Sequence, residues 1–127
     1  GNFQIDVRQV TSPTPDRLFE GSLDGAYNSI ENGKILIRIN KEGTSLTIER
    51  FSGTLVGDRQ TEGAFNFTDA SVFGEIPIDL KKFTSVGTNG NDVIEINGCI
   101  SDEVASGVVI YQREGNAYIG AFSAWIK

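Results

Sequence analysis

The residues best suited to binding chemistry lie in one short stretch, GTNGNDVIE, at positions 87–95. Asn89 and Asp92 supply amide and carboxylate oxygens, and calcium is the ion that such oxygens, together with backbone carbonyls, would bind. Calcium prefers six or more oxygen ligands, and two side chains fall short of that number. Glycine and asparagine are also the residues expected in turns that need a positive φ. The stretch therefore favours a polar loop that leads into a strand. Asn89 and Asp92 are kept as a weak calcium candidate, and no other metal site is expected.

The same nine residues carry part of a repeated motif, G-G-x-G-x-D-x-U-x. Gly87, Gly90, Asp92 and Ile94 match it, and Thr88 replaces its second glycine. In this respect the stretch resembles the calcium-binding nonapeptides of repeats-in-toxin β-rolls, in which successive copies hold calcium between neighbouring coils. The nonapeptides on either side, IDLKKFTSV and INGCISDEV, lack the glycines and aspartate that would complete the ligand shell. One copy cannot build a roll, because each coil needs neighbours to bury its apolar residue.

Catalytic chemistry has few candidates in this chain. Histidine is absent and Cys99 is the single cysteine, which excludes Ser-His and Cys-His hydrolase pairs and a tetrahedral structural zinc site. No phosphate-binding glycine motif and no nucleophile elbow occur. Paired carboxylates, as in glycosidases, are the remaining route. Asp102 and Glu103 are adjacent and point different ways, whereas Asp58 and Glu62 fit a solvated turn. The sequence predicts a protein that is not an enzyme and uses no cofactor.

Aromatic side chains are better candidates for binding, since a β scaffold can present them on a sheet face or around an enclosed ligand. Most should belong to the core, because aromatic residues carry much of the buried area of a β protein. Tyr27 is an exception: it follows a tight turn at Asp24 and Gly25, stands beside Asn28, and is expected at an exposed strand end. Trp125 is a further candidate. We take Tyr27, Asn28 and Trp125 as the predicted ligand-binding residues.

The charge balance limits the class of partner. Seventeen acidic residues against 11 basic ones give a net charge of -6, and no basic cluster interrupts the acidic excess. A phosphate backbone would be repelled, so nucleic acid is excluded as a partner. No apolar run approaches the roughly 20 residues of a spanning helix, so no membrane span is expected. The partners left open are an unknown protein, a glycan and a small apolar ligand.

Alternation of apolar and polar residues recurs along the chain, and no window shows helical spacing over three turns. A first strand is predicted at Phe3 to Val7, followed by a linker from Thr11 to Asp16 in which two prolines interrupt any ladder. Ile35, Ile37 and Ile39 share one face of a later strand, and we expect that face to be buried.

Turn signals divide the rest of the chain. The dipeptides Asn32-Gly33 and Asn97-Gly98 predict turns, and the segment from Ser101 to Ser106 predicts one helical turn. The final strand, from Ala117 to Ile126, has apolar residues on both faces. It is therefore expected to be a central strand that is largely buried on both sides.

Strands joined by short turns predict a single all-β domain over residues 1–127. The expected architecture is an antiparallel meander of about nine strands, forming either a two-sheet sandwich or a flattened barrel. The sequence does not choose between these two forms.

Two segments carry a family resemblance: FEGSLDG, from Phe19 to Gly25, and YIGAF, from Tyr118 to Phe122. With them the chain resembles the small exported β domains that Bacteroidetes-type bacteria make as lipoproteins, many of unassigned function. The resemblance implies export to the periplasm or cell surface, with lipid anchoring through a cysteine upstream of Gly1 as a further expectation. The lack of any methionine suggests in addition that a processed leader has been removed.

The leading functional hypothesis is a noncatalytic exported module that serves binding or structure at the bacterial cell envelope. A lipocalin-like barrel around a small apolar ligand is the alternative, and a glycan-binding surface is a third hypothesis. A hollow interior lined by Phe65, Phe67, Phe122 and Ile37 would favour the barrel. A packed interior with aromatic residues on an outer face would favour glycan recognition.

Overall fold

The computed structural model describes residues 16–25, 28–58, 60–69 and 71–127 of the chain. These residues form strands and turns without a helix, which confirms the all-β prediction. The strands are β1 (Arg17–Asp24), β2 (Ser29–Ile39), β3 (Ser45–Gly57), β4 (Gln60–Phe67), β5 (Ile76–Pro77), β6 (Lys82–Asn89), β7 (Asp92–Ser101), β8 (Val104–Arg113) and β9 (Asn116–Ile126).

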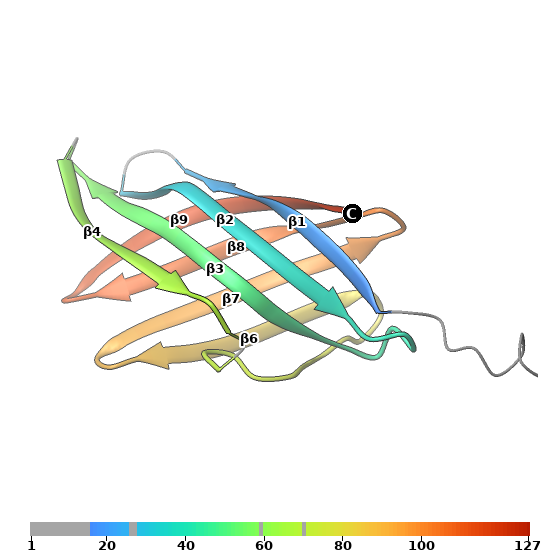
Figure 1. The fold of residues 1–127 in the computed structure, drawn as a ribbon. Coiled ribbons are helices and arrows are strands. Elements are labelled where there is room, and N and C mark those ends of the chain that lie inside the picture. The colour runs from blue at the N-terminus through green and yellow to red at the C-terminus, as the bar shows by residue number, and fades with distance from the viewer. Residues whose placement is uncertain (1–15, 26–27, 59, 70) are drawn as a thin grey trace, which may run out of the picture.

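All these strands belong to one sheet, in the order β4-β3-β2-β1-β9-β8-β7-β6, with β5 paired to β3. The long neighbouring strands are antiparallel. The pairing of β1 with β9 brings the first and last described strands together. The sheet curls on itself, so β1 to β4 lie in front of β6 to β9 (Figure 1). The fold is thus a curled half-barrel, and it combines features of the predicted sandwich and the predicted flattened barrel.

The period-two pattern explains which face of each strand is buried. Ile35, Ile37 and Ile39 are at most 1% exposed, as predicted, and the residues between them are half-buried on the other face. Successive side chains of a strand point to opposite faces of its sheet, so this alternation turns one whole face of β2 inward. The same pattern on the other long strands builds the core between the two layers.

Aromatic rings pack against one another in the interior. Phe65 packs on Phe51 with ring centroids 4.7 Å apart and stacks on Tyr111 at 4.8 Å. Phe67 lies 6.1 Å from Phe51 and 5.8 Å from Phe65, and Phe73 lies 6.0 Å from Phe51, each measured between ring centroids. Rings at these separations are in contact. Side chains therefore occupy the region in which the sequence placed a possible ligand cavity.

Two predicted turns are wrong, because asparagine-glycine pairs serve other purposes here. Asn97 and Gly98 lie within β7 and pair with β6 on one side and β8 on the other. Asn97 accepts a hydrogen bond from Thr84 Oγ1 and donates one to Glu95 Oε2, which holds it in the sheet. Asn32 does adopt a positive φ of 52°, but it does so in a β-bulge inside β2.

The predicted helical turn from Ser101 to Ser106 is also wrong. β7 ends at Ser101 and β8 begins at Val104, and these two residues pair with each other. Asp102 and Glu103 form the tight turn between the strands. Pairing with β7 and β9 already provides hydrogen-bond partners for the backbone groups of this segment, so a local helical turn would add none.

The final strand is central, as predicted, because it pairs with both β1 and β8. The prediction that both of its faces are buried is wrong. Tyr118 and Phe122 are buried on the inner face, whereas Ile119 is 50% exposed and Trp125 is 61% exposed. These apolar residues lie on the outer face of the curled sheet, where no described part of the chain covers them.

The strand predicted at Phe3 to Val7 lies outside the described residues. The predicted linker from Thr11 to Asp16 shares only Asp16 with them, and Asp16 is exposed just before β1.

Candidate functional site

Asp92, one of the two candidate calcium ligands, lies at the start of β7 and is held by two residues of β8. Tyr111 donates its hydroxyl proton to Asp92 Oδ2 at 2.7 Å. Arg113 donates to the same oxygen from Nε at 3.0 Å, and its Nη2 lies 2.9 Å away. The Arg113 guanidinium also lies over the Tyr111 ring, 5.5 Å from its centroid. Asp92 is thus part of a closed ion pair.

These contacts set the pKa values of the group. Burial acts to raise the pKa of Asp92, but the hydrogen bonds from Arg113 and Tyr111 outweigh it and hold the pKa below its ordinary value. Burial, followed by the hydrogen bond to Asp92, raises the pKa of Tyr111. The carboxylate is therefore kept ionised and the phenol kept neutral, which is the state in which they bond to each other.

A second pair lies beside the first at the same end of the barrel. Tyr118 of β9 is the register partner of Tyr111, and its hydroxyl donates to Glu62 Oε1 of β4 at 2.6 Å. That hydrogen bond, followed by burial, raises the pKa of Tyr118. We call Glu62, Asp92, Tyr111, Arg113 and Tyr118 the end cluster. Each ionisable group in it bonds to another, and Glu62 is its exposed member.

The hairpin geometry explains each matched position of the nonapeptide motif without calcium. Gly87 lies where a side chain would collide with the backbone carbonyl of Val72, and Gly90 adopts a positive φ of 62° in the β6–β7 turn. Ile94 is fully buried in the core. Arg113 already supplies the positive charge at Asp92. Among the described residues, no group of three or more acidic or cysteine side chains could hold a metal ion.

Asn28 directly precedes β2, with a positive φ of 51°, and it is half-buried. Its backbone carbonyl accepts a hydrogen bond from the amide of Ile119 at 3.0 Å. Trp125 lies six residues further along β9 than Ile119, about 20 Å away at the rise of a strand. The structure therefore does not bring Asn28 and Trp125 together. Tyr27 lies outside the described residues.

The clearest candidate for a binding site is a groove of about 600 Å³ on the outer face of β1, β2 and β3. Its lining comes from the outer face of β1, from the consecutive residues Asn32 to Leu36 of β2, and from Arg50 of β3. The lining includes Glu20, Ser22, Asp24, Lys34, Leu36 and Arg50. We call this hollow the outer groove.

Two irregularities between β2 and β3 shape the outer groove. The first is the bulge at Asn32, between the paired residues Glu31 and Lys34. In the second, Leu36 pairs with Arg50 but Ile37 pairs with Ile48, so Glu49 is an extra residue on β3. A bulge of this kind bends the strand and re-aims the side chains next to it. As a result Glu49 and Arg50, which are consecutive, both lie outside the core.

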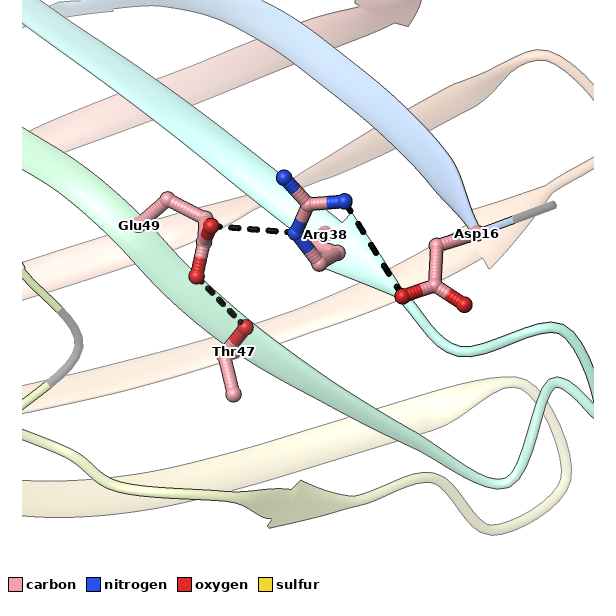
Figure 2. Close-up of polar contacts among 4 residues, drawn as sticks. All are labelled: Asp16, Arg38, Thr47 and Glu49. Carbon is pink, nitrogen blue, oxygen red and sulfur yellow. Dashed lines mark hydrogen bonds and ion pairs between the residues drawn. The ribbon is translucent and has the colours of Figure 1, made fainter.

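Glu49 and Arg50 then take different roles. Figure 2 shows Arg38 donating from Nε to Glu49 Oε1 at 3.0 Å, while Thr47 donates from Oγ1 to Glu49 Oε2 at 3.0 Å. Arg38 also lies 3.9 Å from Asp16 through Nη1. This network satisfies Glu49 and leaves Arg50 as the exposed residue that lines the outer groove.

The charged side chains of the outer groove have few partners. Glu20 is 4.0 Å from Lys127 Nζ, at the limit of an ion pair, and both side chains are at least half exposed. Asp24, Lys34 and Arg50 form no ion pair with another described residue. Two acids and two bases are therefore available around one hollow. In the end cluster, by contrast, the charged side chains are bonded to other members of the cluster.

The outer groove residues were not among those predicted from sequence. Glu20, Lys34 and Arg50 come from three strands, and each looks like an ordinary solvated charge in its own segment. The signal that would have found them is the strand register, since Arg50 pairs with Leu36 and Leu36 pairs with Glu20. That register depends on the bulge at Glu49, which no residue type marks.

Comparison with known proteins finds no matching family model, no matching curated protein and no matching solved structure. The described residues include no helix with the length and apolarity to cross a membrane.

Proposed function

We propose that this protein is a noncatalytic binding module that holds its ligand in the outer groove. The observation that carries the proposal is the contrast between a packed interior and an outer hollow of about 600 Å³ with available charges. Concave sites with a few convergent polar groups are the usual places for ligands. Glu20, Asp24, Lys34 and Arg50 are those groups here.

The distances between the groove carboxylates support a noncatalytic role. Glu20 and Asp24 lie four residues apart on one face of β1, which places them about 13 Å apart at the rise of a strand. Glycosidases need their two carboxylates roughly 5 to 9.5 Å apart. The packed aromatic core gives no support to the alternative of a barrel around a small apolar ligand. Export to a bacterial envelope remains part of the proposal on the sequence resemblance alone.

A second hollow of similar size, about 560 Å³, lies near the β5–β6 turn between Pro77 and Thr84. It has the charged residues Asp79 and Lys82 in its lining, and the strongly exposed Leu80 stands in the turn. We favour the outer groove because it gathers four charged side chains from three strands, which provides more directional contacts for a ligand.

The test is a nuclear magnetic resonance titration of the uniformly ¹⁵N-labelled protein against a diverse library of small polar molecules. The expected result is that binders shift the amide signals of Glu20, Lys34 and Arg50. Lys34→Ala should weaken binding of the best compound several-fold. Lys41→Ala, an exposed lysine in the β2–β3 turn, is the matched control and should not. Shifts confined to the Pro77–Thr84 hollow, or no shifts at all, would contradict the proposal.

A further inference from the structure

Trp125 lies next to the outer groove, one strand beyond its lining, on β9. Arg50 of β3 pairs with Leu36 of β2, Leu36 with Glu20 of β1, and Glu20 with Trp125 of β9. Adjacent strands are about 4.8 Å apart, so this row of four outer-face residues spans about 14 Å across the sheet. The row begins with a guanidinium in the groove, passes an aliphatic side chain and a carboxylate, and ends on an indole that is 61% exposed.

The chemistry of the row fits a ligand with many hydroxyl groups and an apolar ring face. Arg50 donates hydrogen bonds and Glu20 accepts them, so together they match hydroxyls, which do both. The face of an indole carries partial negative charge, which attracts the polarised C–H groups on one side of a sugar ring. Glu20 and Asp24 balance Lys34 and Arg50, so the groove itself does not select for a strongly charged ligand.

The sheet geometry argues against an extended peptide as the occupant. Peptides that bind to sheets do so by adding a strand to a free edge, through backbone hydrogen bonds. β1 and β2 are interior strands here, each paired along both sides, so no free backbone edge lies under the groove. Recognition must come from side chains on the face. An acidic chain with net charge -6 also disfavours phosphate-rich polymers and anionic surfaces.

We propose that the outer groove and Trp125 together bind an uncharged oligosaccharide. One sugar ring stacks on Trp125, and the hydroxyls of the following rings bond to Glu20, Lys34 and Arg50. This inference rests on the proposed binding function and adds the ligand class and a second contact residue, Trp125, which lies outside the groove lining.

The chain is well suited to a direct test because Trp125 is its single tryptophan. Tryptophan emission, excited at a wavelength that tyrosine does not absorb, therefore reports on the proposed stacking position alone. The uncharged probes are cellohexaose, maltohexaose and hexa-N-acetylchitohexaose, titrated separately into the intact protein. The expected result is a saturable change in tryptophan emission with at least one of them. The amide signals of Glu20, Leu36 and Arg50 should shift in the matching ¹⁵N titration.

Variants separate stacking from a general surface effect. By ¹⁵N titration, Trp125→Ala should weaken binding about tenfold, and Trp125→Phe should recover part of the loss because it keeps an aromatic face. Val86→Ala is the matched control: Val86 is an apolar side chain that is equally exposed at 61%, and it lies on β6. It should leave binding unchanged. Trp125 is a surface residue, so its replacement should not unfold the chain.

The possible failures are distinguishable. If the three hexasaccharides give no change while other small polar molecules still shift Glu20, Lys34 and Arg50, the oligosaccharide inference is overturned and the binding function stands. If sugars bind but Trp125→Ala has no effect, the stacking role is overturned. If a short peptide library binds at the groove and sugars do not, the ligand class is wrong. If nothing binds at the groove, both proposals fail.

Discussion

The end cluster and the outer groove use the same kinds of side chain in opposite ways. In the end cluster, Asp92 is bonded to both Tyr111 and Arg113, and Tyr118 is bonded to Glu62. In the outer groove, Arg50 and Lys34 are exposed and form no ion pair with another described residue. A partly buried charge must be paired, because its desolvation otherwise costs stability. An exposed charge has no such requirement and remains available to a ligand.

This difference indicates which charges serve the fold and which are free for function. Arg113 and Arg50 are the sharpest pair for comparison, since each is the arginine that its region contains. The side chain of Arg113 is 26% exposed and lies on Tyr111, whereas Arg50 is exposed in the groove. Substitutions in the two regions should therefore have separable effects on stability and on binding.

Arg113→Ala should have the largest effect on stability. It leaves the carboxylate of Asp92, whose side chain is 14% exposed, without its cation, and it uncovers the Tyr111 ring. We expect the free energy of unfolding to fall by about 2 kcal/mol, as for a partly buried charge that loses its partner. Urea denaturation measures this. Arg50→Ala, the matched groove variant, should change it by less than about 0.5 kcal/mol; equal losses in the two variants would contradict the comparison.

Tyr111→Phe should have a smaller effect. The ring keeps its stacking with Phe65, but Asp92 loses the hydroxyl donor at 2.7 Å. A loss of about 1 kcal/mol is expected for one hydrogen bond to a charged group that keeps a second partner. Tyr118→Phe is the comparison variant and should cost less, because its partner Glu62 is exposed and water can replace the hydroxyl. A larger loss of stability for Tyr118→Phe than for Tyr111→Phe would contradict this order.

The loss of stability at acid pH should depend on the protonation of Asp92. Its pKa lies below the ordinary value of 3.8 in the folded state, so the folded protein binds fewer protons than the unfolded chain as the pH falls toward and below that value. The stabilising contribution is therefore present above about pH 4 and is lost as the pH falls through the folded pKa. Asp92→Asn should flatten this part of the curve, measured by urea denaturation at a series of pH values.

Calcium should have no effect on the melting temperature, which makes it the smallest of these expected effects. Arg113 lies 2.9 Å from Asp92 Oδ2 and supplies the positive charge there, and the hairpin explains the motif glycines. The melting temperature should be the same in calcium and in EDTA, since an ion that does not bind the folded state cannot stabilise it. A rise in melting temperature with calcium, absent in Asp92→Asn, would restore the calcium hypothesis for Asn89 and Asp92.

Much of the fold could be predicted because it depends on local alternation. Ile35, Ile37 and Ile39 are apolar at every second position, and in a strand this alternation indicates that one face is buried. Turns were less predictable. Asn32 adopts the positive φ that its residue type permits, but a bulge uses that conformation as readily as a turn does. Asn97 and Gly98 stay extended because partners on both sides satisfy their backbone groups.

The candidate site was harder to predict than the fold. Trp125 was recognised from its residue type, and the structure places it on the outer face, whereas the sequence pattern suggested that both faces of its strand were buried. Glu20, Lys34 and Arg50 were missed, because nothing in their own segments distinguishes them from other surface charges. Only the pairing of β1, β2 and β3 makes them neighbours.

The sequence by itself determined that this chain is all β, which face of each long strand is apolar, and that it contains no histidine. Each of these follows from residue type or from spacing along one strand. The tertiary structure alone decided that the sheet curls into a filled half-barrel, that Asp92 is neutralised by Arg113, and that four charges and an indole share one outer face. Those facts depend on strand register and on two bulges, and register is set by contacts between segments that lie far apart in the sequence.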